Sequence, residues 1–62
     1  MNFDRTIAKY EEDLRNNMIA NLYHFMKELE MGYSQRISWL KNKFFLSERR
    51  IEQIIKEYSD GE

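Results

Sequence analysis

The residues best suited to chemistry in this sequence are three consecutive acidic residues, 11–13, and a single histidine, His24. Carboxylates and imidazoles can hold a metal ion or act as general acids and bases. Consecutive positions on a helix point in different directions, so these three carboxylates cannot converge on one ion. The sequence has no cysteine, no second histidine and no glycine-rich phosphate loop. We therefore expect no enzyme activity, no cofactor, no metal site and no small-molecule substrate.

Length and composition restrict the fold that could carry any other function. The chain has 62 residues, which is enough for a single domain spanning residues 1–62. Its net charge is −1. It has no proline and two glycines, and 34% of its residues are charged, so few positions interrupt a helix. No uncharged stretch approaches the roughly 20 apolar residues of a membrane span. We expect a small all-α domain in the cytoplasm, with no membrane contact.

The first half of the sequence carries an apolar stripe with the helical period of three to four residues. Its members are Phe3, Ile7, Tyr10, Leu14, Met18, Leu22, Phe25 and Leu29. More apolar residues widen the stripe beyond Asn16-Asn17, so we expect the second half to be more buried. Because asparagine competes with helical hydrogen bonds, residues 3–31 form either one long bent helix or two. Its first part, Phe3, Ile7, Tyr10 and Leu14, either closes the domain's own core, which we favour, or pairs with a second copy across a two-fold axis.

Three small residues in the rest of the chain mark the expected helix ends. Gly32 is expected to close the N-terminal helical part, because glycine readily takes the left-handed conformation that ends a helix. Ser34 is expected to cap a helix over about 35–44, and Ser47 a helix over about 48–58. Residues 59–62 are expected to form a frayed acidic tail. The sequence thus predicts three or four helices, the last two lying within residues 34–58.

The last two expected helices carry the most informative pattern. About three residues join them, too few for a comfortable antiparallel loop, so they should cross steeply. Residues 37–56 resemble the twenty-residue helix-turn-helix of DNA-binding proteins, whose five apolar positions are here Leu40, Phe44, Leu46, Ile51 and Ile54. The stretch 46–55 resembles the corresponding part of sigma-factor region four and of small helix-turn-helix proteins on bacterial mobile elements. Lys41 and Phe45 stand where that family usually has a small residue and glycine, which predicts a longer or differently shaped turn.

The resemblance implies a DNA-binding protein that inserts its last helix into the major groove, as a transcriptional regulator or mobile-element factor of bacteria. Arginine can pair with guanine, glutamine with adenine and glutamate with cytosine, while lysine and serine suit phosphates. Carried over position by position, the resemblance makes the DNA-facing residues of the last helix and its cap Ser47, Glu48, Arg49, Arg50, Glu52, Gln53 and Lys56, with Ser47 against a phosphate. On the preceding helix it places against the DNA backbone Arg36, Lys41 and Lys43.

The total charge of −1 does not favour DNA binding, but the distribution of charge along the chain is consistent with it. Residues 1–32 carry a net charge of −2, residues 33–58 carry +3, and the last four residues carry −2. The basic residues thus gather on the helix pair, the asymmetry expected of a DNA-binding protein. A charge of +3 neutralises few phosphates, so we expect a homodimer that binds two half-sites.

An alternative function belongs to a different class. The chain could be a non-catalytic protein-interaction or dimerisation module that uses the apolar stripe and Trp39 and needs no nucleic acid. Trp39 projects from the far side of its helix relative to Ile37 and Leu40. We expect it to pack against the N-terminal helical part or against a second chain.

Overall fold

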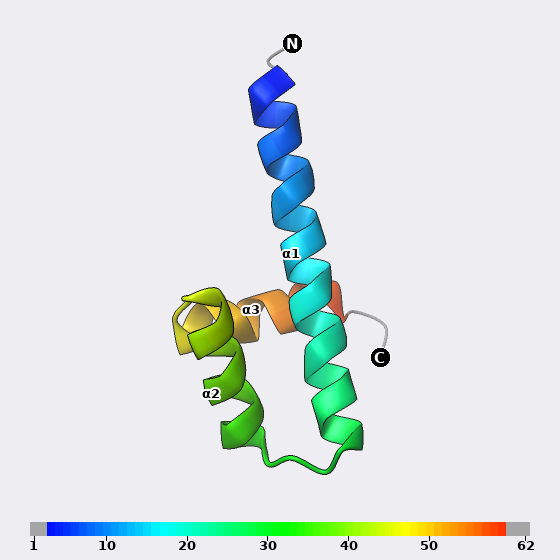
Figure 1. The fold of residues 1–62 in the computed structure, drawn as a ribbon, viewed down its shortest axis with the longest axis vertical. Helices are drawn as coiled ribbons and strands as arrows, with labels where there is room; N and C mark the ends of the chain where they lie inside the picture. Colours follow the sequence, from blue (N-terminus) through cyan, green and yellow to red (C-terminus); the bar gives the residue numbers. More distant parts are fainter. Residues whose placement is uncertain (1–2, 60–62) are drawn as a thin grey trace.

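The computed structural model describes residues 3–59, and these form three α-helices with no strand. The helices are α1 (Phe3–Glu28), α2 (Tyr33–Phe44) and α3 (Glu48–Tyr58). In Figure 1, α2 runs antiparallel beside the C-terminal part of α1, and α3 crosses behind α1 near the middle of its length. The expected all-α class is therefore confirmed, with three helices rather than four. Residues 60–62 of the expected acidic tail lie outside the described part.

The asparagine pair does not interrupt α1, which is one continuous helix. Asn16 is buried, and its Oδ1 accepts hydrogen bonds from Nε and Nη2 of Arg15 at 3.1 and 2.9 Å. Asn17 donates from its amide to the backbone oxygen of Asp13 at 2.9 Å. With both side chains satisfied in these ways, the backbone keeps its helical hydrogen bonds through this point.

The apolar stripe does not form the core, so the expectation that its first part, from Phe3 to Leu14, closes the domain's core was wrong. The α1 residues buried in the domain are Asn16, Ile19, Ala20 and Met26. Every stripe member except Leu22 is exposed, from Ile7 at 39% to Phe3 at 72%. At 100° per residue the two sets lie on nearly opposite faces of α1. The second half of α1 is nevertheless the more buried, as expected, because residues 3–12 are all exposed.

The segment between α1 and α2 is built differently from the expectation. Glu30, not Gly32, takes the left-handed conformation, with φ of 63°. Gly32 is extended, with φ of −67° and ψ of 157°, and is the N-cap of α2, so α2 begins at Tyr33 and Ser34 lies within its first turn. The N–H of Gly32 donates to Oε1 of Gln35 at 3.4 Å, which satisfies the donor that precedes the helix.

The connection from α2 to α3 combines a strained residue with a well-made cap. Phe45 ends α2 in the left-handed conformation with φ of 57°, the geometry that glycine usually supplies. Its side chain is 91% exposed. Ser47 is the N-cap of α3 as expected, since its Oγ accepts from the backbone N–H of Arg50 at 3.2 Å. The expected bounds of the last helix, 48–58, are confirmed.

The hydrophobic core is small and lies where the three helices meet. Each helix contributes two buried residues, which are Ile19, Met26, Ile37, Leu40, Ile51 and Ile54. Around them pack partly buried side chains, among which are Phe44 and Leu46. All five apolar positions of the pattern over 37–56 thus lie in the core or against it. Two hydrogen bonds tie the end of α3 to α1: Tyr58 donates to Asp13 at 2.8 Å, and His24 bonds the hydroxyl of Ser59 at 2.8 Å.

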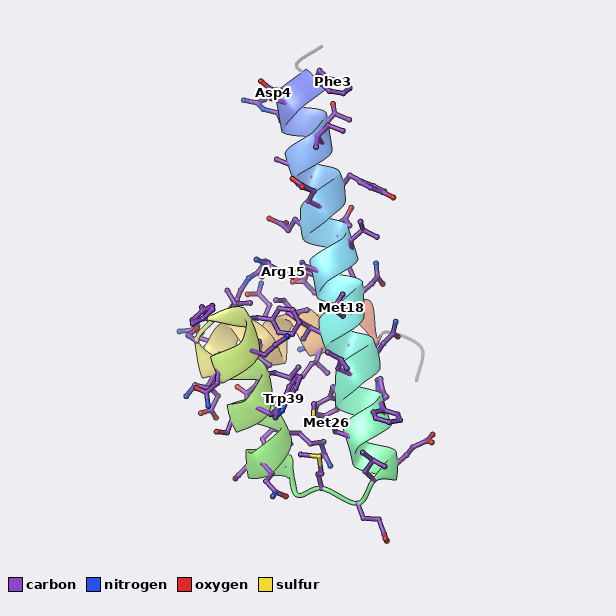
Figure 2. The ribbon with its side chains drawn as sticks, viewed as in Figure 1. Phe3, Asp4, Arg15, Met18, Met26 and Trp39 are labelled. Carbon is purple, nitrogen blue, oxygen red and sulfur yellow. The ribbon has the colours of Figure 1, made fainter. Side chains whose placement is uncertain are left out.

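Residues 3–12 project from this core. Figure 1 shows the start of α1 extending past both other helices, and Figure 2 shows Phe3 and Asp4 with no other helix beside them. We call residues 3–12 the projecting segment. Residues 13–59 form the three-helix body.

Candidate nucleic-acid interface

The side of α3 that faces away from the core presents three polar side chains in a row. Arg49, Gln53 and Lys56 are all exposed and follow one another at intervals of four and three residues, so they share one helix face. Ile51 and Ile54, which anchor α3 in the core, lie on the opposite face. We call this row the outer ridge of α3. It carries two positive charges and no carboxylate.

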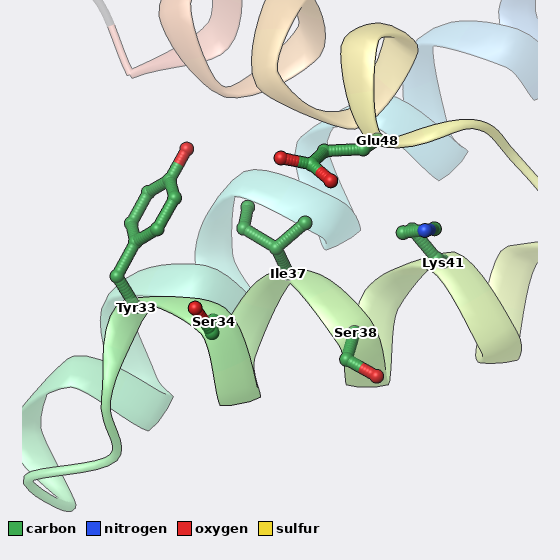
Figure 3. Close-up of a pocket in the computed structure, with 6 residues that line it drawn as sticks. All are labelled: Tyr33, Ser34, Ile37, Ser38, Lys41 and Glu48. Atoms are coloured by element: carbon green, nitrogen blue, oxygen red, sulfur yellow. The ribbon is translucent and has the colours of Figure 1, made fainter.

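The two glutamates at the start of α3 are turned toward α2 instead. Glu52 accepts a short hydrogen bond from the hydroxyl of Tyr33 on α2. This bond raises the pKa of Tyr33 to about 12, because the phenol must give up the bond and place a charge beside the carboxylate when it ionises. Glu48 lies over Ile37, as Figure 3 shows. The glutamates therefore flank the outer ridge and do not interrupt it.

A shallow hollow of about 90 Å³ lies between α2 and the start of α3. Figure 3 shows its lining, in which Tyr33 rises from α2 toward α3 and Glu48 reaches down from the first turn of α3. The remaining lining residues are Ser34, Ile37, Ser38 and Lys41. The hollow holds one cation and one carboxylate, so it has no strong preference for either charge.

The remaining expected contacts are placed unevenly around the outer ridge. Lys43 is exposed on α2, whereas Lys41 is half-buried beside the hollow. Arg50 is half-buried on the flank of α3 away from Glu52. Ser47 is exposed, and although its oxygen caps α3, its hydroxyl hydrogen can still be donated to a phosphate.

Arg36 is not on the surface, so the expectation that its side chain contacts the DNA backbone was wrong. It is 9% exposed, and its Nη1 donates to the backbone oxygen of Met31 at 2.6 Å. Its Nη2 donates to the hydroxyl of Tyr23 at 3.3 Å, and the guanidinium carbon lies 4.7 Å from the centre of the Tyr23 ring. Arg36 therefore joins α2 to α1 and to the loop between them. Its charge is used inside the body.

His24 and Asp13, two of the residues suited to chemistry by type, have structural roles. His24 is half-buried on Ser59, and Asp13 receives the Tyr58 hydroxyl, so both fix the end of α3. Across residues 3–59 no three His, Cys, Asp or Glu side chains come together as a metal site would require. In the same part of the chain, no helix has the length and apolar character needed to cross a membrane.

Sequence reasoning missed Tyr33, the residue that links α2 to Glu52. The sequence signal for Tyr33 was its position directly after Gly32. A helix predicted to begin at residue 33, and not at residue 35, would have placed Tyr33 in the first turn of α2. Trp39 remains 44% exposed and is not one of the core residues, so it only partly meets the expectation of packing.

Comparison with known proteins adds no family to this geometry. No protein-family model, curated protein or solved structure matches the chain. The site therefore has to be interpreted from its own residues.

Proposed function

We propose that the chain is a non-catalytic protein that binds double-stranded DNA through a helix-turn-helix formed by α2 and α3. In this proposal α3 enters the major groove, and the protein acts in the cytoplasm of a bacterium as a transcriptional regulator or mobile-element factor. The observation that carries the proposal is the outer ridge of α3, with Arg49, Gln53 and Lys56 exposed together on a helix fixed by its opposite face. A rigid helix with free hydrogen-bonding side chains is what base-edge recognition requires.

The roles within this interface follow from side-chain chemistry. Arg49 can donate two hydrogen bonds to a guanine, and Gln53 can pair with an adenine one turn further along α3. Lys56 and Lys43, both exposed, are placed to neutralise phosphates. Ser47 and the free backbone N–H groups of the first turn of α3 suit another phosphate.

The remaining candidate contacts stand at the edges of the interface. Glu48, Glu52, Arg50 and Lys41 flank the outer ridge, so they would adjust specificity more than supply affinity. Tyr33 holds Glu52 against α2, which keeps that carboxylate away from the phosphates.

Two copies are part of the same proposal. Residues 33–58 carry a net charge of +3, and one copy neutralises too few phosphates for tight binding at physiological salt. A homodimer would double the contacts and address two half-sites about one helical turn apart.

The proposal is tested by selecting duplexes from a randomised pool with the wild-type protein and measuring affinity for the selected sequence by fluorescence anisotropy. Arg49→Ala is expected to weaken binding by about 1–3 kcal/mol and to relax preference at one base pair. Lys43→Ala is expected to weaken selected and unselected duplexes alike and to reduce the slope of affinity against salt.

Lys27→Ala is the matched control, because Lys27 is an exposed cation on α1, far from α3 in the sequence. It should leave affinity and salt slope unchanged. If no duplex is enriched, or if Lys27→Ala weakens binding as much as Arg49→Ala, the DNA-binding proposal is wrong.

A second candidate function rests on a different observation. The apolar stripe leaves seven large apolar side chains exposed along α1 and at Leu29, the residue after it, and Trp39 is partly exposed on α2. Exposed apolar patches of this extent mark interaction sites. A helical protein-interaction module would use these residues and would give no response to DNA in the same anisotropy experiment.

A further inference from the structure

The outward face of α1 is the largest unexplained feature of the molecule. Seven of the eight members of the apolar stripe are between 39% and 72% exposed: Phe3, Ile7, Tyr10, Leu14, Met18, Phe25 and Leu29. The opposite face of the same helix supplies the α1 part of the core. Apart from Leu22, which packs against the core, the stripe members are therefore not needed to form the core of their own chain.

The spacing of the stripe keeps it on one side of a straight helix. Two series with an eleven-residue interval make up most of it, Phe3, Leu14 and Phe25, and Ile7, Met18 and Leu29. Eleven residues in three turns is about 3.67 residues per turn, close to the 3.6 of an undistorted helix. The face thus stays in register over a helix of about 39 Å, at 1.5 Å per residue.

The spacing is also symmetric about position 16. Counted from either end, the intervals are four, three, four, four, four, three and four residues. Two copies of α1 placed antiparallel, with the two position-16 residues level, bring the stripe residues opposite one another in pairs. These pairs are Phe3 with Leu29, Ile7 with Phe25, Tyr10 with Leu22, and Leu14 with Met18 of the other copy.

We propose that this face is a homodimer interface in which the two α1 helices pack antiparallel across a two-fold axis. The inference deepens the two-copy part of the proposed function by naming the surface and the orientation. An isologous interface needs one patch that is complementary to itself, and the symmetric spacing supplies it.

The exposed area is sufficient for a stable dimer. If each of the seven exposed side chains loses about 100 Å², which is nearly all that large apolar groups expose at these fractions, each copy buries at most about 700 Å². Two copies then bury up to about 1,400 Å², within the range of specific protein interfaces.

Charge favours the antiparallel arrangement over the parallel one. In a parallel pair, the two copies of Glu11, the acidic residue of 11–13 that lies on the stripe side, would be at the same height and repel. In the antiparallel pair Glu11 lies level with Asn21 of the other copy, which is uncharged. The projecting segment then packs beside the anchored part of the partner's α1, and both bodies stay on the outside.

The flanks of the stripe also distinguish a second copy from a lipid surface. Asp4, Glu11 and Glu28 lie on or beside it, with Asn17 and Asn21 near its middle and one half-buried cation, Arg15, whose guanidinium is hydrogen-bonded to Asn16. Helices that lie on anionic membranes carry lysine and arginine at these positions. The border here would be repelled by such a membrane.

The oligomeric state is tested by sedimentation equilibrium of the full chain over micromolar concentrations. The wild type is expected to have the mass of two chains, and Leu14→Gln/Phe25→Gln is expected to raise the dimer dissociation constant by about tenfold or more. Both positions are exposed in one chain, so circular dichroism should show the helices of the three-helix body retained, with any loss of helix confined to the projecting segment. Phe45→Gln is the matched control, since Phe45 is 91% exposed and off this face, and it should leave the dimer intact.

The orientation is tested by disulfide formation, which a chain without cysteine allows cleanly. Ile7→Cys mixed with Phe25→Cys should form a disulfide between the two variants, because these positions face each other. Ile7→Cys alone should not, because its two copies lie about 27 Å apart in the antiparallel pair.

Each outcome bears on the proposal. A disulfide of Ile7→Cys with itself means a parallel pair and overturns the orientation. A monomeric wild type, or a dimer that Leu14→Gln/Phe25→Gln does not weaken, overturns the interface. DNA binding by a protein that dimerises elsewhere would leave the proposed function standing while this inference fails.

Discussion

The two parts of α1 belong to one helix and share one apolar stripe, yet they have opposite surroundings. Residues 13–28 are held from one side by α2 and α3, through Ile19 and Met26. Residues 3–12 contribute nothing to the core and are exposed throughout. The difference teaches that the stripe was never the inward face. In the body α1 has two apolar faces and uses the second for its own core, whereas in the projecting segment only the outward face exists.

The body and the projecting segment should therefore be stabilised by different interactions. The body is ordered by its own core and polar contacts, and its stability should not depend on protein concentration. The projecting segment contributes no residue to the core, and short helices without core packing are marginal in water. Its order should depend on a second copy. The following predictions test this division, beginning with the largest effect.

The first prediction concerns the core of the body. Leu40 is fully buried, so Leu40→Ala should lower the free energy of unfolding by about 2–5 kcal/mol through lost apolar contact and a residual cavity. Urea denaturation followed by circular dichroism, at low protein concentration, measures it. Ile7→Ala in the projecting segment is the control and should change stability by less than about 0.5 kcal/mol. The reverse order of effects would break the division.

The second prediction concerns the buried arginine. Arg36→Ala removes the hydrogen bonds to Met31 and Tyr23 and the packing on the Tyr23 ring, so it should cost about 1–3 kcal/mol in the same denaturation experiment. Arg36→Lys should recover little of this, because an ammonium cannot reproduce the planar fork. Lys43→Ala, an exposed cation of α2, should leave stability unchanged. An unchanged free energy of unfolding in Arg36→Ala would contradict the structural role of this residue.

The third prediction concerns the turn before α3. Phe45 holds a left-handed conformation that costs a residue with a Cβ atom about 1–2 kcal/mol, while glycine avoids this cost but loses more entropy on folding. Phe45→Gly should therefore raise the melting temperature, with a net gain of roughly 0.5–1 kcal/mol. Phe45→Ala should have little effect, because the side chain is 91% exposed. A lower melting temperature for Phe45→Gly would show that the phenyl ring stabilises the turn.

The fourth prediction is the smallest and depends on pH. Tyr33 donates to Glu52 only while it is protonated, and its pKa is raised from 10.0 to about 12 in the folded chain. The unfolded chain therefore loses this proton first as the pH rises. The stability from the bond is fully present below pH 10 and is lost as the pH rises through about 12.

This fourth prediction is measured as the difference in melting temperature between wild type and Tyr33→Phe. The difference should be small and constant at neutral pH, because Tyr33 is 47% exposed, and should shrink above about pH 10. The other tyrosines contribute to both proteins and cancel. A difference that grows with pH would contradict the direction of the shift.

What the sequence predicted well was local. The bounds of α3 and its Ser47 cap depend on residues within one turn of each other, and both predictions were confirmed. The five apolar positions over residues 37–56 also lie in or against the core, because a short helix with one apolar face can bury only that face.

What the sequence did not predict depends on neighbours in space. A helical period cannot say whether its apolar face meets the same chain or another molecule, so the core was favoured over a second copy for the first part of the stripe. The buried face of α1 includes Asn16 and Ala20, which carry little hydrophobic signal. Arg36 was assigned to the surface because only the folded chain brings Tyr23 and Met31 to it. The base-reading roles along α3 remain predictions.

The most direct test of the division within α1 is amide hydrogen exchange measured at several protein concentrations. Amides of residues 19–26 should be protected at every concentration, because the body holds them. Amides of residues 7–12 should exchange rapidly in dilute protein and become protected as the concentration rises through the dimer dissociation constant. Protection of residues 7–12 that is the same at all concentrations, whether high or absent, would contradict the account.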